Sequence, residues 1–237
     1  MREFFLSPRL AALAEQVPRD TTFADIGTDH ALLPIRLLRR GVITRAIAAD
    51  LREGPLQRAR ETARRHGLEA QISFRLGDGL SVLRPGEADT IAIAGMGGGT
   101  IAGILGAASW ARTEGTLLLL QPMSAVRELR VWLQQNGFTV ERETLCADGK
   151  WRYVCLAARG GQAPPLTPGE VWAGRQWRGM EAPLRADYLE DALARATRAL
   201  EGIQKSRKEE DTPRREALAA AAAELMRMRE EWMTWQR

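Results

Sequence analysis

Three aspartates stand at the ends of short apolar segments, and glycines accompany two of them. Asp25 precedes Gly27, Asp50 ends the next apolar segment, and Asp78 lies between two glycines. A carboxylate about 20 residues after a glycine turn can accept hydrogen bonds from ribose hydroxyls, and Asp78 could accept one from an adenine amino group. A dense glycine run, Gly95–Gly99, would leave room for a ligand's reactive end beside the backbone. The pattern indicates a cofactor that contains adenosine.

The first glycine turn departs from the dinucleotide-binding pattern G-x-G-x-x-G, because Asp29 stands where the second glycine would be. An acidic side chain there would repel a pyrophosphate. A cationic cofactor without phosphate, such as S-adenosylmethionine, therefore suits this turn better than NAD. Each acid also has a plainer reading: Asp50 as a helix cap, Asp78 as a turn residue, and Asp29 with His30 as a cap of the first helix.

Apolar segments that alternate with amphipathic ones must position these residues. The apolar segments are nearly continuous, which is typical of parallel strands covered by helices on both faces. Strands are expected at 23–26, 45–50, 72–76, 89–94 and 115–121, and helices at 8–17, 31–40, 55–66, 100–105 and 124–135. Ser7 is expected to cap the first helix. In such a sheet ligands bind at the carboxyl ends of the strands, where the aspartates and glycines stand.

The next part of the chain alternates apolar and polar residues. Segments 138–145 and 151–157 flank Asp148-Gly149, which predicts an antiparallel hairpin. A hairpin after five strand–helix units completes the seven-stranded, doubly wound Rossmann-like α/β sheet of class I methyltransferases. Residues 1–160 are expected to form this catalytic domain.

Residues 160–169 are rich in Gly and Pro and read as a linker. Beyond it, apolar residues recur at spacings of three and four, from Leu189 to Ile203 and again from Leu218 to Trp235. Two such seams, joined near Asp211, predict an antiparallel helical hairpin of coiled-coil type in residues 161–237. The small residues Ala196 and Ala221 would let the two helices approach closely.

Composition narrows the class of protein. The 237 residues are 45% hydrophobic and 27% charged, with a net charge of +4, which fits a polyanionic partner without requiring one. The two cysteines, Cys146 and Cys155, lack metal-ligand spacing. No apolar run is long enough to span a bilayer, and the N-terminal one is too short for a secretory signal. We expect a cytoplasmic monomer with no metal and no membrane contact.

Four motifs carry a resemblance to a known family. They are Asp25-Ile-Gly-Thr-Asp-His-Ala, Gly77-Asp-Gly-Leu, Ile93-Ala-Gly-Met-Gly-Gly and Leu120-Gln-Pro. Together they resemble bacterial tRNA (adenine-22-N1)-methyltransferases, class I S-adenosylmethionine enzymes with a C-terminal coiled-coil hairpin. The resemblance covers the whole chain. One departure is Met123, where the family commonly has Asn, so a polar side chain is missing there.

The resemblance implies a set of cofactor contacts: Asp25, Gly27, Asp29, His30, Asp50, Leu51, Asp78, Gly79, Gly95, Met96 and Gly97. The residues expected to shape the pocket for the target adenine are Asp29, His30, Met96, Gln121 and Pro122. Adenine N1 has a free lone pair at neutral pH, so methylation needs no prior deprotonation, and placement alone can supply up to roughly 7–11 kcal/mol. Because N1 lies on the pairing edge, the base must be unpaired and everted.

The resemblance also implies a tRNA substrate, contacted at its elbow or D-arm and gripped by the helical hairpin. Basic residues that could bind RNA are Arg36, Arg39, Arg40, Arg58, Arg60, Arg64, Arg65, Lys205, Arg207, Lys208, Arg214 and Arg215. The plainer reading is that each cluster is a solvated face paired with acids such as Glu209 and Glu210.

Three other functions stay open from the sequence. The first is a methyltransferase of the same fold that acts on another RNA or on a small molecule. The second is a catalytically silent module that binds RNA or a protein partner. The third is an NAD-linked oxidoreductase, which Asp29 and the closing hairpin disfavour.

Overall fold

The computed structural model describes residues 5–112, 115–204 and 209–236, in two compact units, Met1–Ala163 and Pro164–Arg237. The division falls close to the boundary expected after residue 160. Each unit has its own buried apolar residues and is described by itself.

The first unit is built on a seven-stranded sheet with the strand order β3-β2-β1-β4-β5-β7-β6. Strands β1 to β5 pair with one another in parallel. Strand β7 is antiparallel to both of its neighbours, β5 and β6. The strands are β1 (Phe23–Ile26), β2 (Ala46–Asp50), β3 (Ile72–Leu76), β4 (Thr90–Gly97), β5 (Leu117–Ser124), β6 (Phe138–Asp148) and β7 (Trp151–Gly160). The predicted doubly wound sheet with a closing hairpin is confirmed.

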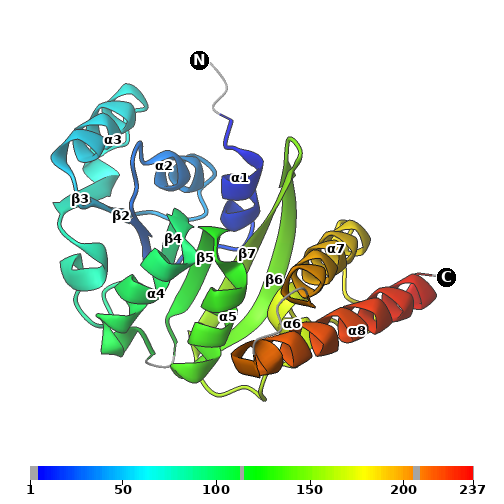
Figure 1. Ribbon diagram of the computed structural model, residues 1–237. Helices are drawn as coiled ribbons and strands as arrows, with labels where there is room; N and C mark the ends of the chain where they lie inside the picture. The colour runs from blue at the N-terminus through cyan, green and yellow to red at the C-terminus, as the bar shows by residue number, and fades with distance from the viewer. Residues whose placement is uncertain (1–4, 113–114, 205–208, 237) are drawn as a thin grey trace. The chain divides into compact units, whose positions relative to one another are not determined.

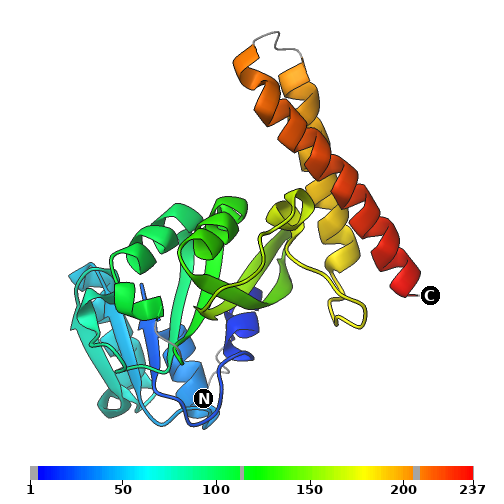
Figure 2. The same cartoon turned by 90° about the horizontal axis from the view of Figure 1, so that it is seen from below.

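Helices cover both faces of this sheet, as Figures 1 and 2 show. One face carries α1 (Pro8–Ala14), α2 (Leu32–Arg39) and α3 (Glu53–Arg65), and the other carries α4 (Gly98–Gly106) and α5 (Val126–Gln135). Short 3₁₀ turns lie at Glu69–Gln71, Gly79–Val82 and Ser109–Arg112. Every residue of β1 and β2 is buried, because helices cover these central strands from both sides.

Three local predictions for this unit are corrected. Ser7 occupies the N-cap position of α1, but its side chain makes no capping hydrogen bond. β4 continues past Ala94 through a bulge and ends at Gly97, so the predicted glycine loop begins inside the strand. β5 continues to Ser124, where a helix was expected to begin, because pairing with β4 persists to that residue.

The second unit contains α6 (Pro168–Ala173), α7 (Arg185–Gln204), a 3₁₀ turn (Glu209–Asp211) and α8 (Thr212–Trp235). The long helices α7 and α8 lie side by side and antiparallel (Figure 2). Leu189 and Ala196 of α7 and Ala221 and Leu225 of α8 are buried. The described part of the tail therefore contains the helical hairpin that the apolar seams predict.

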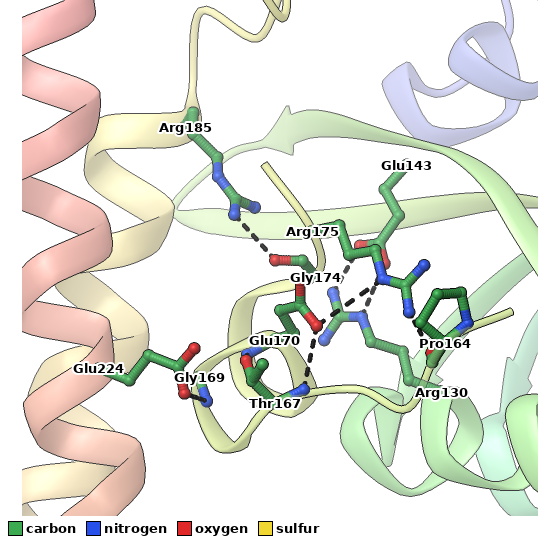
Figure 3. A network of polar contacts seen from close by, with 10 residues as sticks. All are labelled: Arg130, Glu143, Pro164, Thr167, Gly169, Glu170, Gly174, Arg175, Arg185 and Glu224. Atoms are coloured by element: carbon green, nitrogen blue, oxygen red, sulfur yellow. Dashed lines mark hydrogen bonds and ion pairs between the residues drawn. The ribbon is translucent and has the colours of Figure 1, made fainter. Parts of the chain in front are cut away.

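Helix α6 corrects the prediction that residues 160–169 are only a linker. Thr167 accepts a hydrogen bond from the Glu170 backbone N–H, and the Glu170 carboxylate accepts one from the Thr167 N–H (Figure 3). This capping box was readable as Thr-x-x-Glu in the sequence, although Pro and Gly concealed it. The Gly169 N–H also donates to Glu224 at 2.8 Å (Figure 3), which ties α6 to α8.

Candidate cofactor and substrate site

The parallel strands bring the predicted acids to one edge of the sheet. Asp50 ends β2 beside Leu76, the last residue of β3, and the Gly77 N–H donates to the Asp50 carbonyl at 3.0 Å. The Gly27 N–H donates likewise to the Ala49 carbonyl at 2.8 Å. These bonds continue the ladder past the strand ends, so the turns that carry the acids are fixed next to one another.

Asp25 is a buried carboxylate with one strong partner. The Thr28 hydroxyl donates to it at 2.7 Å. Burial raises the pKa of Asp25 from 3.8 to about 6; the Thr28 hydrogen bond opposes that rise, and the charge of Asp50 adds to it. Two acids so close to each other favour a ligand that brings positive charge or hydrogen-bond donors.

Asp50 is buried, and one of its carboxylate oxygens accepts from the Arg52 N–H at 2.9 Å. It does not cap α3 itself, because Arg52 is the N-cap residue. Within the described residues its second oxygen has no hydrogen-bond partner. The next residue, Leu51, is 64% exposed and offers an apolar surface beside this acid.

Asp78 is exposed at the end of β3. It occupies the N-cap position of the 3₁₀ turn that follows, yet its side chain makes no capping bond. Gly79, next to it, has a φ of +51° and lies against Ile104 of α4. The Asp78 carboxylate thus has no partner in the part of the chain that the structure describes, and it can accept hydrogen bonds from a ligand.

The side chain of Gln121 fixes the bulge at the end of β4 by a hydrogen bond. Its side-chain oxygen accepts from the Gly95 N–H at 3.2 Å, and its amide nitrogen donates to the Pro122 carbonyl at 3.0 Å. Gln121 has no exposed surface, and Pro122 is also buried. Gln121 therefore positions the Gly95 turn through these hydrogen bonds. Its expected contribution to the adenine pocket stays a prediction.

Met96 joins two of the predicted turns. A Cβ built on Gly27 would lie 2.1 Å from the Met96 methyl group, and Gly27 has a φ of +75°. The positive φ therefore favours glycine at position 27, and a side chain there would also force the flexible end of Met96 to move. Gly97, which follows, is half-buried and begins the turn into α4.

Asp29 and His30 lie at the rim of this site. Asp29 has a φ of +45°, and its carboxylate accepts from Arg58 of α3 at 2.9 Å. His30 Nε2 lies 3.7 Å from the other oxygen of that carboxylate. Left-handed backbone recurs at Ala31, with a φ of +52°, and after β5 at Ala125, with a φ of +54°.

The predicted RNA-binding arginines differ in how they are paired. Arg40 forms an ion pair with Glu15 at 2.6 Å, and Arg64 forms a bidentate pair with Glu69 at 2.9 Å. Both are exposed, so these pairs add little stability, and the arginines can exchange them for phosphate. The plainer reading of solvated, paired faces applies to these two and to Arg58.

The other basic residues predicted to bind RNA fall into three groups. Arg60 stacks on the ring of Phe74 at 5.0 Å, and Arg65 donates to the Glu61 carbonyl. Exposed or half-buried positions are occupied by Arg36, Arg39, Arg214 and Arg215. Outside the described residues lie Lys205, Arg207 and Lys208.

Sequence reasoning missed Arg9 of α1. Its guanidinium lies 2.9 Å from the Met123 sulfur and 3.7 Å from the position of a Cβ on Gly95. Met123 is 42% exposed at the end of β5, in the position where the family commonly has Asn. Arg9 brings a charged donor to that place. The Ser-Pro-Arg-Leu start of the first helix contained it, but only the fold shows which strand end it reaches.

The described residues contain no group of three or more His, Cys, Asp or Glu side chains arranged to hold a metal ion. Nor does any helix in the described ranges have the length and apolar character needed to cross a membrane.

Comparison with known proteins places the chain among methyltransferases. A family model described as a methyltransferase domain matches residues 6–156. The tRNA (adenine(22)-N(1))-methyltransferase of Bacillus subtilis is 40% identical over 161 residues, which are 68% of each protein. The crystal structure of the B. subtilis M1A22 tRNA methyltransferase TrmK superposes with a TM-score of 0.83 at 30% identity, over 96% of this chain and 100% of that one. A putative tRNA (m1A22) methyltransferase of Streptococcus pneumoniae, solved with S-adenosyl-L-methionine, has a TM-score of 0.79 at 30% identity, over 95% and 100% of the two chains.

Proposed function

We propose, because this chain belongs to the tRNA (adenine(22)-N1)-methyltransferase family, that it methylates N1 of adenine 22 in tRNA with S-adenosylmethionine as the methyl donor. The resemblance carried by the four sequence motifs is confirmed at the level of the family. The observation that supports the proposal most directly is the set of three carboxylates, Asp25, Asp50 and Asp78, at one edge of the sheet beside the Gly95 turn.

The residues present fit this cofactor. Asp50 keeps one carboxylate oxygen available for a ribose hydroxyl, and Asp78 can accept from an adenine amino group. Leu51, next to Asp50 in the chain, offers exposed apolar surface for a flat ring. Asp25, whose charged form burial disfavours, suits a cofactor that carries positive charge. When bound, S-adenosylmethionine supplies an electrophilic methyl group, which the N1 lone pair of adenine attacks without prior deprotonation.

The chain's own residues then have to orient the base and exclude water. The Gly95–Gly97 turn, held by Gln121, supplies backbone beside the reacting position. Asp29 can accept from the exocyclic amine, whose acidity rises as the ring becomes cationic, and Arg58 and His30 hold that carboxylate at the rim. Catalysis rests on placement, which can account for up to roughly 7–11 kcal/mol of the barrier.

The decisive experiment is methyl transfer to an unmodified tRNA transcript, followed by reverse transcription. N1-methyladenine blocks base pairing, so the stop should appear at adenine 22. A stop elsewhere would favour the same-fold alternative on another RNA site, and failure to bind S-adenosylmethionine would favour the silent binding module.

Two variants separate the proposed roles of the acids. Asp78→Ala should weaken S-adenosylmethionine binding, and Asp29→Ala should lower turnover with little change in cofactor affinity. Unchanged turnover in Asp29→Ala would contradict its role at the adenine. Unchanged cofactor affinity in Asp78→Ala would contradict the adenine assignment.

The proposal includes the second unit, residues 161–237, as an aid to tRNA binding through Arg214, Arg215 and the basic residues between α7 and α8. If several phosphates are neutralised, tRNA affinity should fall steeply as salt is raised. A tRNA affinity that does not change with salt concentration would argue against phosphate binding by these residues. We also propose that the enzyme is cytoplasmic and monomeric; sedimentation with and without tRNA would test the monomeric state.

A further inference from the structure

The hairpin of β6 and β7 extends past the sheet at the edge that carries the candidate site. The last β5–β7 pair is Leu120 with Leu156, whereas β6–β7 pairing continues to Asp148 with Trp151. Trp151 therefore lies about 16 Å further along β7 than that pair, at roughly 3.3 Å per residue. Because β7 is antiparallel to β5, this extension runs toward the carboxyl ends of the parallel strands. Figure 1 shows the ribbon rising beside α1 at that edge.

The extension presents an unusual side chain to solvent. Trp151 is 61% exposed, although a tryptophan ring is among the largest apolar surfaces a residue can bury. Lys150 places its ammonium group 5.2 Å from the centre of the Trp151 ring. The cation stacks on the ring electrostatically, and it adds positive charge next to the exposed aromatic surface.

The strand pattern places Trp151 on the same face of the ribbon as Arg9. Side chains alternate along a strand, so Trp151, Tyr153 and Cys155 share one face. The Cys155 thiol lies 3.7 Å from the Arg9 carbonyl oxygen, which identifies that face as the one α1 covers. The guanidinium of Arg9 reaches Met123 at the end of β5. An exposed aromatic ring and two cations thus lie at the edge of the sheet formed by the carboxyl ends of the parallel strands, where the candidate site is.

We propose that Trp151, with Lys150 beside it, is a stacking platform for an unpaired nucleotide next to the target adenine of the RNA substrate. Everting a base to expose N1 leaves its neighbours without a stacking partner. Proteins that bind unpaired RNA meet this need with aromatic rings flanked by basic residues, which accept any base and contact the backbone phosphates. This inference rests on the proposed function, since it needs an RNA substrate.

The test compares three full-length variants with the unchanged protein. Trp151→Leu keeps an apolar side chain but removes the aromatic ring, and Trp151→Phe keeps a smaller ring. Trp151→Leu should weaken binding of an unmodified tRNA transcript by about 5- to 150-fold, and Trp151→Phe should recover most of that loss. Lys150→Ala should reduce the slope of log affinity against log salt by about one, whereas Trp151→Leu should leave the slope unchanged.

Cofactor affinity and melting temperature are the controls. Both should be unchanged in all three variants, because neither side chain lies among the cofactor residues and Trp151 is largely exposed. If Trp151→Leu binds and methylates tRNA like the unchanged protein, the stacking platform is wrong. The same conclusion follows if Trp151→Leu and Trp151→Phe lose equal affinity. If the unchanged protein does not methylate tRNA at all, the proposed function fails first.

Discussion

Replacing Asp25 by Asn should stabilise the cofactor-free protein at neutral pH while weakening its hold on S-adenosylmethionine. The carboxyl group is buried, and its pKa is raised to about 6 by that burial, with the Asp50 charge adding to the effect. At pH 7 the group is ionised in a place that disfavours its charge. An amide removes the charge and can still accept the hydrogen bond that Thr28 donates.

The size of the effect follows from linkage. The pKa of Asp25 is 3.8 in the unfolded chain and about 6 in the folded protein. At pH values between these two, the folded protein therefore holds the proton more often than the unfolded chain does. Stability contributed by the protonated form is therefore fully present below pH 4 and is lost as pH rises to about 6. At about 1.4 kcal/mol for each pH unit, the ionised group costs up to about 3 kcal/mol above that range.

Urea unfolding of both proteins at several pH values between 4 and 8 measures this directly. The stability difference between Asp25→Asn and the unchanged protein isolates Asp25, because every other group is common to both. The variant should gain stability relative to the unchanged protein from pH 4 to 6, and the gain should then level off. A difference that does not vary with pH would refute the reasoning. Calorimetric titration of cofactor at pH 7.5 should show weaker binding in the variant.

Three further substitutions test packing by unfolding measurements. Gly27→Ala should lower stability and cofactor affinity together, because a Cβ there meets the Met96 methyl at 2.1 Å and φ is +75°; adding Met96→Ala should remove only the steric part. Arg130→Ala should cost about 3–5 kcal/mol, since it leaves Glu143 without its buried bidentate partner at 2.7 and 2.9 Å, and Glu143→Gln in the same chain should recover part of this loss. Leu225→Ala, at a fully buried position of α8, should cost about 2–5 kcal/mol without changing cofactor affinity.

The central strands could be predicted closely from the sequence. β1 and β3 match the expected segments, and β2 begins one residue later than expected, because a buried parallel strand is a short apolar run bounded by turn residues. The ends of β4 and β5 could not be predicted this way. Gly95, the bulge residue with a φ of +75°, and Met123 lie within strands only because the two strands continue to pair with each other on either side of the bulge. Pairing between distant segments leaves no local pattern in the sequence.

The candidate site likewise has residues that a local sequence pattern predicts and contacts that only the fold reveals. Asp25, Asp50 and Asp78 were found from the sequence, since acids at strand ends meet at one edge of a parallel sheet. The burial of Gln121, the contact of Met96 with Gly27 and the approach of Arg9 to Met123 depend on how side chains pack across elements. No spacing in the chain encodes those contacts.

Ala31 and Ala125 follow the ends of β1 and β5 with left-handed backbone, which is unfavourable for any residue with a Cβ. Glycine would relieve about 1–2 kcal/mol of that strain at each position, yet it would also allow each turn many other conformations. Alanine restricts the turns to fewer shapes, so little chain entropy remains to be lost when a ligand arrives. The conformational cost is met once, when the protein folds, and does not recur in each catalytic cycle.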